Sequence, residues 1–166
     1  MVAMEDLLRR IAGVEATSGL AEVLDKRADI FEMTQESHDA ALMPADPGGI
    51  SHAERAALAC RVARLTDAPD FATHYEDLMS KAGAVGTTAR IVDLEFLGGD
   101  DTRLAALIRH VDLIANDPKS ATGDAIEALK GAGISEPDIV RLSELVAFLS
   151  YQLRVAAGLK LMRVLT

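Results

Sequence analysis

The sequence predicts an all-α fold, and three observations favour this prediction. Apolar residues recur at helical spacing along most of the chain, and no segment shows the strict alternation that is typical of a β-strand. Aromatic residues make up only 4% of the chain and Trp is absent, so the core has to be aliphatic, which suits helices. Serine, aspartate, proline and glycine residues stand where helices would begin and end.

Length and charge limit the class of protein. A chain of 166 residues fits a single domain, residues 1–166, which is long enough to bury a core without disulfides. The formal net charge of −9 argues against nucleic acid as a partner, because such binding depends on clustered Lys and Arg. The single cysteine cannot form an internal disulfide.

The apolar segments predict neither a signal peptide nor a membrane partner. The first 13 residues contain Glu5 and Asp6 and lack an uninterrupted apolar stretch. The longest apolar run, residues 145–153, is interrupted by polar residues and is too short to span a bilayer. We therefore expect a soluble cytoplasmic protein.

Residues 1–27 are expected to form an N-terminal helical extension. A short amphipathic helix over residues 4–12 ends at Gly13. Helical periodicity resumes over residues 20–43, with an interruption near 25–27. The turn-forming sequence ADPGG then ends this segment.

The next two helices form the centre of the predicted fold. Ser51 can cap the first of them, while Glu54 can reach back to the Ser51 amide in a capping box. This helix, over residues 51–66, is apolar nearly all round, as central helices are, and we expect Cys60 to be buried in it. A tight turn leads to a second helix over residues 69–82, which has proline in its first turn.

Further helices complete the chain. They are expected over residues 88–97, where the signals are mixed, over 102–116 after a cap at Asp101, over 123–130 after Thr122, and from Ser135 to about 161. The sequence Gly-Ile-Ser at 49–51 recurs at 133–135, each time before a long helix. This weak repeat predicts two related helical halves that face each other.

Three titratable residues after the tight turn form the first candidate site. Asp67, Asp70 and His74 have i, i+3, i+7 spacing, which places them on one helical face if the helix includes Asp67. Such a set could bind a divalent metal or perform acid–base catalysis. The alternative is that Asp67 caps the helix and Asp70 stabilises its first turn, without any function for either carboxylate.

Other polar residues have a functional and a structural interpretation. Glu54 is a candidate catalytic residue or only a member of the capping box. Tyr151 and Arg154 lie one turn apart on the final helix and could bind an anionic or carbonyl ligand, although Arg154 could instead form an ion pair between subunits. His38, His52 and His110 show no metal-ligand spacing and are expected at the surface. The residues predict no cofactor and no metal.

Two segments within residues 28–162 carry a resemblance to a known family. They are GGISHAERAALACRVARLT, residues 48–66, and DPKSATGDAIEALKGAGISEPDIVRLSELVAFLSYQLRVAAGL, residues 117–159. On these residues the chain resembles the carboxymuconolactone decarboxylase and alkylhydroperoxidase-D-like superfamily, nearest its peroxidase-related branch. The resemblance implies an all-helical subunit that assembles into dimers, trimers or hexamers.

The redox motif of that family is missing from this chain. Peroxidase members of the family carry a glutamate, then C-x-x-C, then a histidine four residues after the second cysteine. Aligned without a gap, the glutamate, cysteine and histidine positions hold Ala56, Ala68, Phe71 and Tyr75. Shifted by one residue, they hold Arg55, Asp67, Asp70 and His74. Neither register supplies a thiol, so dithiol peroxidase chemistry at this site is excluded.

Two functions remain from different classes. The first is a small-molecule binder or non-thiol enzyme that uses the family pocket, with His74 or Tyr75 as the polar group and Tyr151 and Arg154 across from it. The second is a non-catalytic oligomeric protein that assists a catalytically complete relative. The ligand of the first is not specified by the sequence, and a homo-oligomer is expected in either case.

Overall fold

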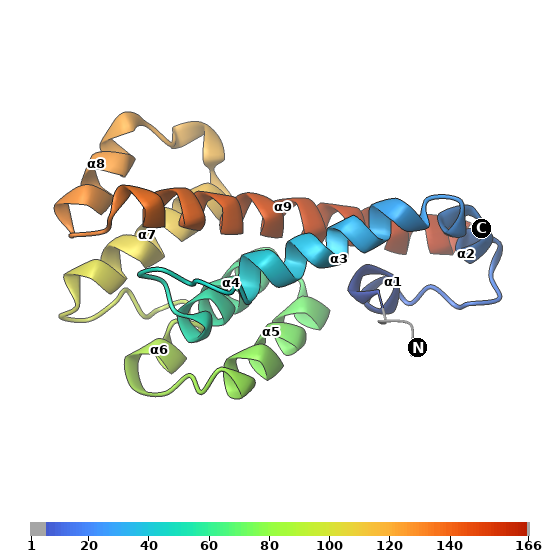
Figure 1. The fold of residues 1–166 in the computed structure, drawn as a ribbon, viewed down its shortest axis with the longest axis horizontal. Coiled ribbons are helices and arrows are strands. Elements are labelled where there is room, and N and C mark those ends of the chain that lie inside the picture. The colour runs from blue at the N-terminus through green and yellow to red at the C-terminus, as the bar shows by residue number, and fades with distance from the viewer. Residues whose placement is uncertain (1–5, 166) are drawn as a thin grey trace.

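The structure, a computed structural model, describes residues 6–165, and every regular element in this range is a helix. The all-α prediction is confirmed. The elements in chain order are α1 (Leu7–Ala12), α2 (Gly19–Asp25), α3 (Ala28–Leu42), α4 (His52–Leu65), α5 (Pro69–Lys81), α6 (Gly86–Arg90), α7 (Thr102–Asn116), the 3-10 turn η1 (Pro118–Ser120), α8 (Gly123–Gly131) and α9 (Glu136–Leu165) (Figure 1).

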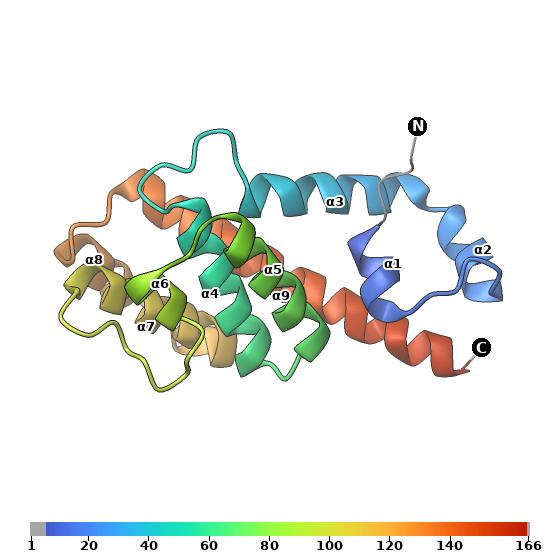
Figure 2. The same cartoon turned by 90° about the horizontal axis from the view of Figure 1, so that it is seen from below.

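The final helix α9 runs along the whole molecule and contacts α1, α3, α4, α7 and α8 (Figure 1). The helices α4, α7 and α8 lie beside its first half. Figure 2 shows α1 between α3 and the second half of α9. The first helix is thus joined to the last, and Gly13 ends α1 in a left-handed conformation as expected (φ 65°). Residues 4 and 5 of the predicted helix lie outside the described range.

The central position of α4 is confirmed. Every residue from Arg55 to Ala63 is buried, and the alanines on this helix allow α5 to approach closely. The capping box is formed: Ser51 Oγ accepts from the Glu54 amide at 3.2 Å, and Glu54 Oε2 accepts from the Ser51 amide at 2.9 Å. Cys60 is fully buried, as predicted.

A buried arginine on α4 explains why the prediction of a helix over residues 88–97 was wrong. The helix α6 ends at Arg90, and the backbone that follows turns its carbonyls toward Arg61, which is 1% exposed. The guanidinium of Arg61 donates to four of these carbonyls, those of Ile91, Asp93, Leu94 and Phe96. It also forms a two-point ion pair with Asp112 of α7, at 2.6 and 2.7 Å. Carbonyls that converge on one buried cation cannot all point along a helix axis, so this segment does not form a regular helix.

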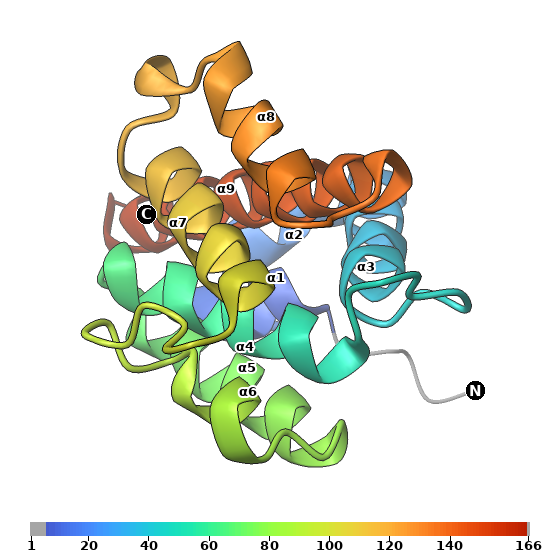
Figure 3. The same cartoon turned by 90° about the vertical axis from the view of Figure 1, so that its left-hand side faces the viewer.

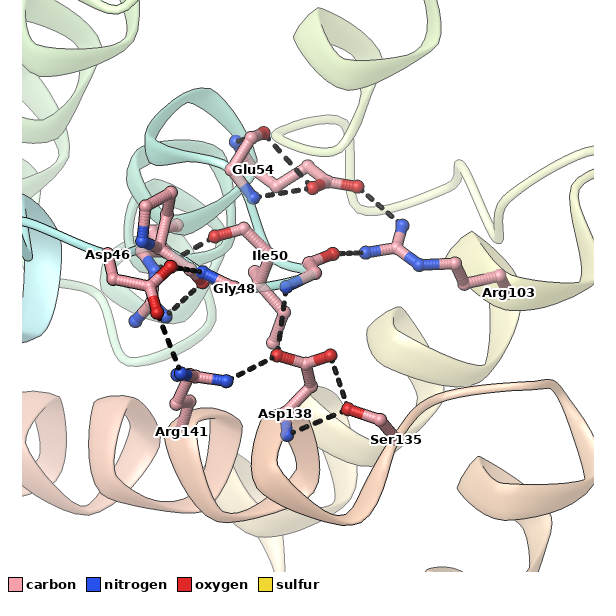
Figure 4. A network of polar contacts seen from close by, with 12 residues as sticks. Asp46, Gly48, Ile50, Glu54, Arg103, Ser135, Asp138 and Arg141 are labelled. Carbon is pink, nitrogen blue, oxygen red and sulfur yellow. Dashed lines mark hydrogen bonds and ion pairs between the residues drawn. The ribbon is translucent and has the colours of Figure 1, made fainter.

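The starts of α4 and α9 are joined by a polar network (Figure 4). The Gly49 amide donates to Asp138 Oδ1 at 2.9 Å, and Ser135 Oγ donates to Asp138 Oδ2 at 2.6 Å. A Cβ at position 49 would lie 2.5 Å from the Asp138 carboxylate, so glycine is needed for this close approach. The two Gly-Ile-Ser sequences therefore meet in space, while their origin in a repeat stays a prediction.

The helix α9 is longer and more apolar than the sequence argument allowed. It contains 30 residues and includes an 18-residue window with a mean hydropathy of 1.3, so its length and composition would suit a membrane span. Core helices of soluble proteins have the same properties, and 33% of this window is buried in the fold. The longest apolar run, residues 145–153, is too short to reveal this property, which appears only over a longer window of the helix.

Candidate functional site

A cleft of about 320 Å³ lies where the turn between α4 and α5 faces α9. We call it the charged cleft. Its polar lining comes from both sides, with Thr66 and Asp67 on the turn and Ser150, Arg154 and Lys160 on α9. Its apolar lining is formed by Ala68, Phe71, Ala115, Leu153, Ala156 and Ala157. The structure thus brings together two predicted site residues, Asp67 and Arg154.

The conformation of Asp67 differs from both sequence interpretations. Asp67 has φ 52° and is the only non-glycine residue with positive φ between residues 6 and 165. It lies outside α5, whose N-cap is Ala68 and has no side-chain capping hydrogen bond. The prediction that Asp67, Asp70 and His74 share one helical face was wrong, and so was the alternative that Asp67 caps α5. A left-handed residue costs about 1 kcal/mol, and such strain often accompanies a functional position.

The two cations of the cleft differ in how they are bound. Lys160 Nζ lies 2.5 Å from Asp70 Oδ2, so Asp70 is held in an ion pair. Arg154 is exposed and forms no hydrogen bond or ion pair with any residue of the described range. All the donors of its guanidinium are therefore available to a ligand.

A second group of polar residues, formed by Arg10, His74, His38, Gln152 and Tyr75, connects α1, α5, α3 and α9 and runs from the surface at Arg10 to the buried Gln152. We call it the histidine chain. Arg10 Nη2 lies 3.4 Å from His74 Nδ1, and His74 Nε2 lies 3.2 Å from His38 Nε2. His38 Nδ1 lies 3.3 Å from Oε1 and 3.2 Å from Nε2 of Gln152, and the same Oε1 accepts a hydrogen bond from the Tyr75 hydroxyl at 2.9 Å.

The direction of these hydrogen bonds follows from the arginine at one end. Arginine only donates, so His74 Nδ1 accepts and the ring hydrogen of His74 sits on Nε2. That hydrogen points at His38 Nε2, which places the hydrogen of His38 on Nδ1, facing Gln152 Oε1. With this tautomer assignment, every ring nitrogen of His38 and His74 has a hydrogen-bond partner.

Burial keeps the side chains of His38, His74 and Tyr75 uncharged at neutral pH. Desolvation, the nearby His38 and Arg10 together lower the pKa of His74 to about 4. Desolvation also lowers the pKa of His38, although the bond to Gln152 opposes this effect. Burial raises the pKa of Tyr75, so its hydroxyl stays protonated. Phe71 of the charged cleft stacks on Tyr75 with ring centres 5.9 Å apart, yet no member of the histidine chain lines the cleft.

The remaining predicted site residues are engaged elsewhere. The Tyr151 hydroxyl lies 3.0 Å from Thr34 Oγ1 on α3, and Tyr151 does not line the cleft beside Arg154. Glu54 completes the capping box and accepts from Arg103 Nη1 at 2.6 Å, so both of its oxygens have structural partners (Figure 4). The role of Glu54 in the capping box is confirmed, while a catalytic role stays a prediction.

His38 and Gln152 are not among the site residues that the sequence predicts. They lie 114 positions apart, and His38 was expected at the surface but is only 4% exposed. The burial of His38 could have been found, because Thr34, His38 and Leu42 follow one face of α3 at intervals of four residues. His110 is buried as well, which contradicts the same expectation, whereas His52 is half-buried and bonded to the Pro44 carbonyl.

The thiol of Cys60 and the arrangement of possible metal ligands bear on redox and metal chemistry. Burial raises the pKa of the Cys60 thiol to about 11, so the thiol stays protonated at neutral pH, as expected of a core cysteine. Across residues 6–165, no group of three or more His, Cys, Asp or Glu side chains is placed to hold a metal ion.

No protein-family model, curated protein or solved structure matches the chain. The resemblance to the carboxymuconolactone decarboxylase and alkylhydroperoxidase-D-like superfamily stays a prediction.

Proposed function

We propose that the protein binds a small organic anion in the charged cleft. The observation that carries this proposal is the unpaired guanidinium of Arg154. It lines the same cleft as Lys160 and a group of apolar side chains. A guanidinium can hold a carboxylate through two parallel hydrogen bonds. Phe71 and Leu153 can pack against the hydrocarbon part of the same ligand.

The opposite side of the cleft restricts the ligand further. Asp67 has no hydrogen bond to its side chain within residues 6–165, and it lines the cleft together with Arg154. A second negative group near Asp67 would be repelled, whereas a hydroxyl or amine could donate to it. We therefore propose a monocarboxylate with a short apolar body and a donor group at its far end.

Binding is favoured over catalysis by the position of the histidine chain. A general acid or base has to reach the proton that it transfers, directly or through one water. His38 and His74 are neutral, bind each other and do not line the cleft. We propose a cytoplasmic binding protein, a divergent member of the superfamily named above without its redox dithiol.

The experiment is a titration with 4-hydroxybenzoate, a monocarboxylate whose hydroxyl group lies at the opposite end of the ring, followed by NMR. We expect shifts at residues 66–71 and 150–160, and about ten-fold weaker binding to the Arg154→Gln variant, which loses a charge-assisted pair. Arg109→Gln is the matched control, because Arg109 is exposed on α7 outside the cleft. Equal weakening by both substitutions, or shifts confined to other regions, would contradict the proposal.

A homo-oligomer is the second candidate, and the end of α9 supports it. Leu161, Val164 and Leu165 are 62%, 75% and 75% exposed, and Val23 of α2 is 52% exposed. We propose that a second copy of this chain covers these side chains, because monomers rarely expose such a group of large apolar residues together. Light scattering should then report an oligomer that the paired substitution Leu161→Glu and Val164→Glu dissociates.

A further inference from the structure

A second cavity of about 320 Å³ lies between α7, α8 and α9, which meet at one end of the molecule (Figure 3). We call it the neutral cavity. Its lining includes His110 and Ile114 of α7, Gly123 and Ile126 of α8, and Ser143 and Ala147 of α9. None of its lining residues carries a full charge, and none is shared with the charged cleft. Its volume is at the lower end of the range for small-molecule sites.

His110 is the unusual residue of this cavity. His110 is only 6% exposed, and its Nδ1 is buried without a hydrogen-bond partner. In the described chain, Asp6 Oδ2 is the only other such atom, and that oxygen still lies 3.3 Å from the Arg9 guanidinium. A buried polar group without a partner costs about 1–3 kcal/mol, so its presence needs a reason.

The two ring nitrogens of His110 have different surroundings. Nε2 has no hydrogen bond within residues 6–165 either, but it is not among the atoms that are closed off from solvent. Burial lowers the pKa of His110, so one nitrogen carries the only ring hydrogen at neutral pH. A buried N–H without an acceptor is rarer than an unused lone pair, which favours the tautomer with the hydrogen on Nε2.

We propose that the neutral cavity binds an uncharged, mainly apolar small molecule that carries one carbonyl oxygen, and that His110 Nε2–H donates a hydrogen bond to this oxygen. The apolar side chains of Ile114, Ile126 and Ala147 would pack against the rest of the molecule. A charged ligand does not fit, because no counter-charge lines the cavity.

Of the other polar side chains in the lining, one is already used. Ser143 Oγ donates to the Ile139 carbonyl at 2.8 Å. Thr122 also lines the cavity, and its hydroxyl has no hydrogen bond within residues 6–165, so His110 and Thr122 are the two side chains that could donate to a ligand. Space also remains at the first residue of α8, since a Cβ built on Gly123 meets no atom within 4 Å. Because Gly123 lines the cavity, a larger side chain at position 123 should reduce the space for a ligand without a clash at its Cβ.

The experiment compares cyclohexanone with methylcyclohexane, which have similar size and differ in the carbonyl oxygen. The probes are titrated into protein labelled at the isoleucine methyl groups. We expect both to shift Ile114 and Ile126 but not Ile50, which is buried elsewhere. Beyond the difference in hydration of the two probes, the hydrogen bond should give cyclohexanone a preference of about five-fold over methylcyclohexane.

Two variants make the result decisive. His110→Phe keeps a flat ring of similar shape, and it should abolish the preference for cyclohexanone. Gly123→Leu should weaken both probes, whereas the matched control Gly131→Leu, on the same helix and equally open, should not. The proposal is overturned if the wild-type protein binds neither probe at these isoleucines, or if the preference for cyclohexanone survives in His110→Phe.

Discussion

His38 and His110 are both buried, with exposed fractions of 4% and 6%, but their surroundings are opposite. Both ring nitrogens of His38 have partners, on His74 and Gln152, and these partners come from different helices. His110 has no partner for Nδ1. Burial of a polar group is unfavourable unless it is hydrogen-bonded. The comparison therefore supports a structural role for His38, and it supports the proposal that a ligand bonds to His110 at Nε2, which also has no partner within residues 6–165.

The largest effect should come from breaking the complete network. Replacing Gln152 by Leu removes the acceptor shared by Tyr75 and His38, and leaves two buried groups unpaired. We expect the free energy of unfolding to fall by about 3 kcal/mol, measured by chemical denaturation. Gln35→Leu is the control, because Gln35 is half-buried and water can replace its bonds. A similar loss in both variants would show that the histidine chain contributes little.

Acid should weaken the network by a smaller amount. The pKa of His74 is about 4 in the folded protein and 6.5 in the unfolded chain, so the unfolded chain binds the proton more readily. The contribution of His74 is complete above pH 6.5 and is lost as the pH falls toward 4. Because His74 is only half-buried, we expect a loss of about 1 kcal/mol between pH 7 and pH 5.

The pH effect can be assigned to His74 by substitution. Denaturation curves at pH 7 and pH 5 should differ less for His74→Asn than for the wild-type protein, because Asn does not titrate. An equal decline in both proteins would assign the acid sensitivity to other groups.

The smallest effect on stability should come from replacing His110, whose Nδ1 has no hydrogen-bond partner. His110→Phe removes a buried nitrogen that has no bond to lose, so we expect the free energy of unfolding to stay unchanged or to rise by about 1 kcal/mol. Denaturation at pH 7 without ligand is the measurement. A loss of more than about 2 kcal/mol would mean that His110 stabilises the empty protein, and the contrast with His38 would disappear.

Features that depend on a few neighbouring residues could be predicted from the sequence. The capping box of Ser51 and Glu54, the start of α5 at Pro69 and the end of α1 at Gly13 involve residues at most three positions apart or a single backbone conformation. Local hydrogen bonds decide such features, so local patterns indicate them.

Features that depend on distant residues could not be predicted in the same way. The backbone after α6 is shaped by Arg61, which lies 30 or more positions earlier. The turn at Asp67 adopts a conformation that its side chain does not require. In the candidate site, Asp67 and Arg154 were identified, but Lys160 was not, because only the packing of α9 against the α4–α5 turn brings it there.

The contact between the first and last helices has a consequence for biosynthesis. Arg163 donates to the Gly13 carbonyl across 150 positions, and α1 packs on the second half of α9. A nascent chain leaves the ribosome from its N-terminus, so α1 emerges long before its binding surface is translated. Leu7, Leu8 and Ile11 must stay without their final contacts during that interval. The central helices can pair earlier, whereas closure of the N-terminal region has to wait until the second half of α9 has been translated.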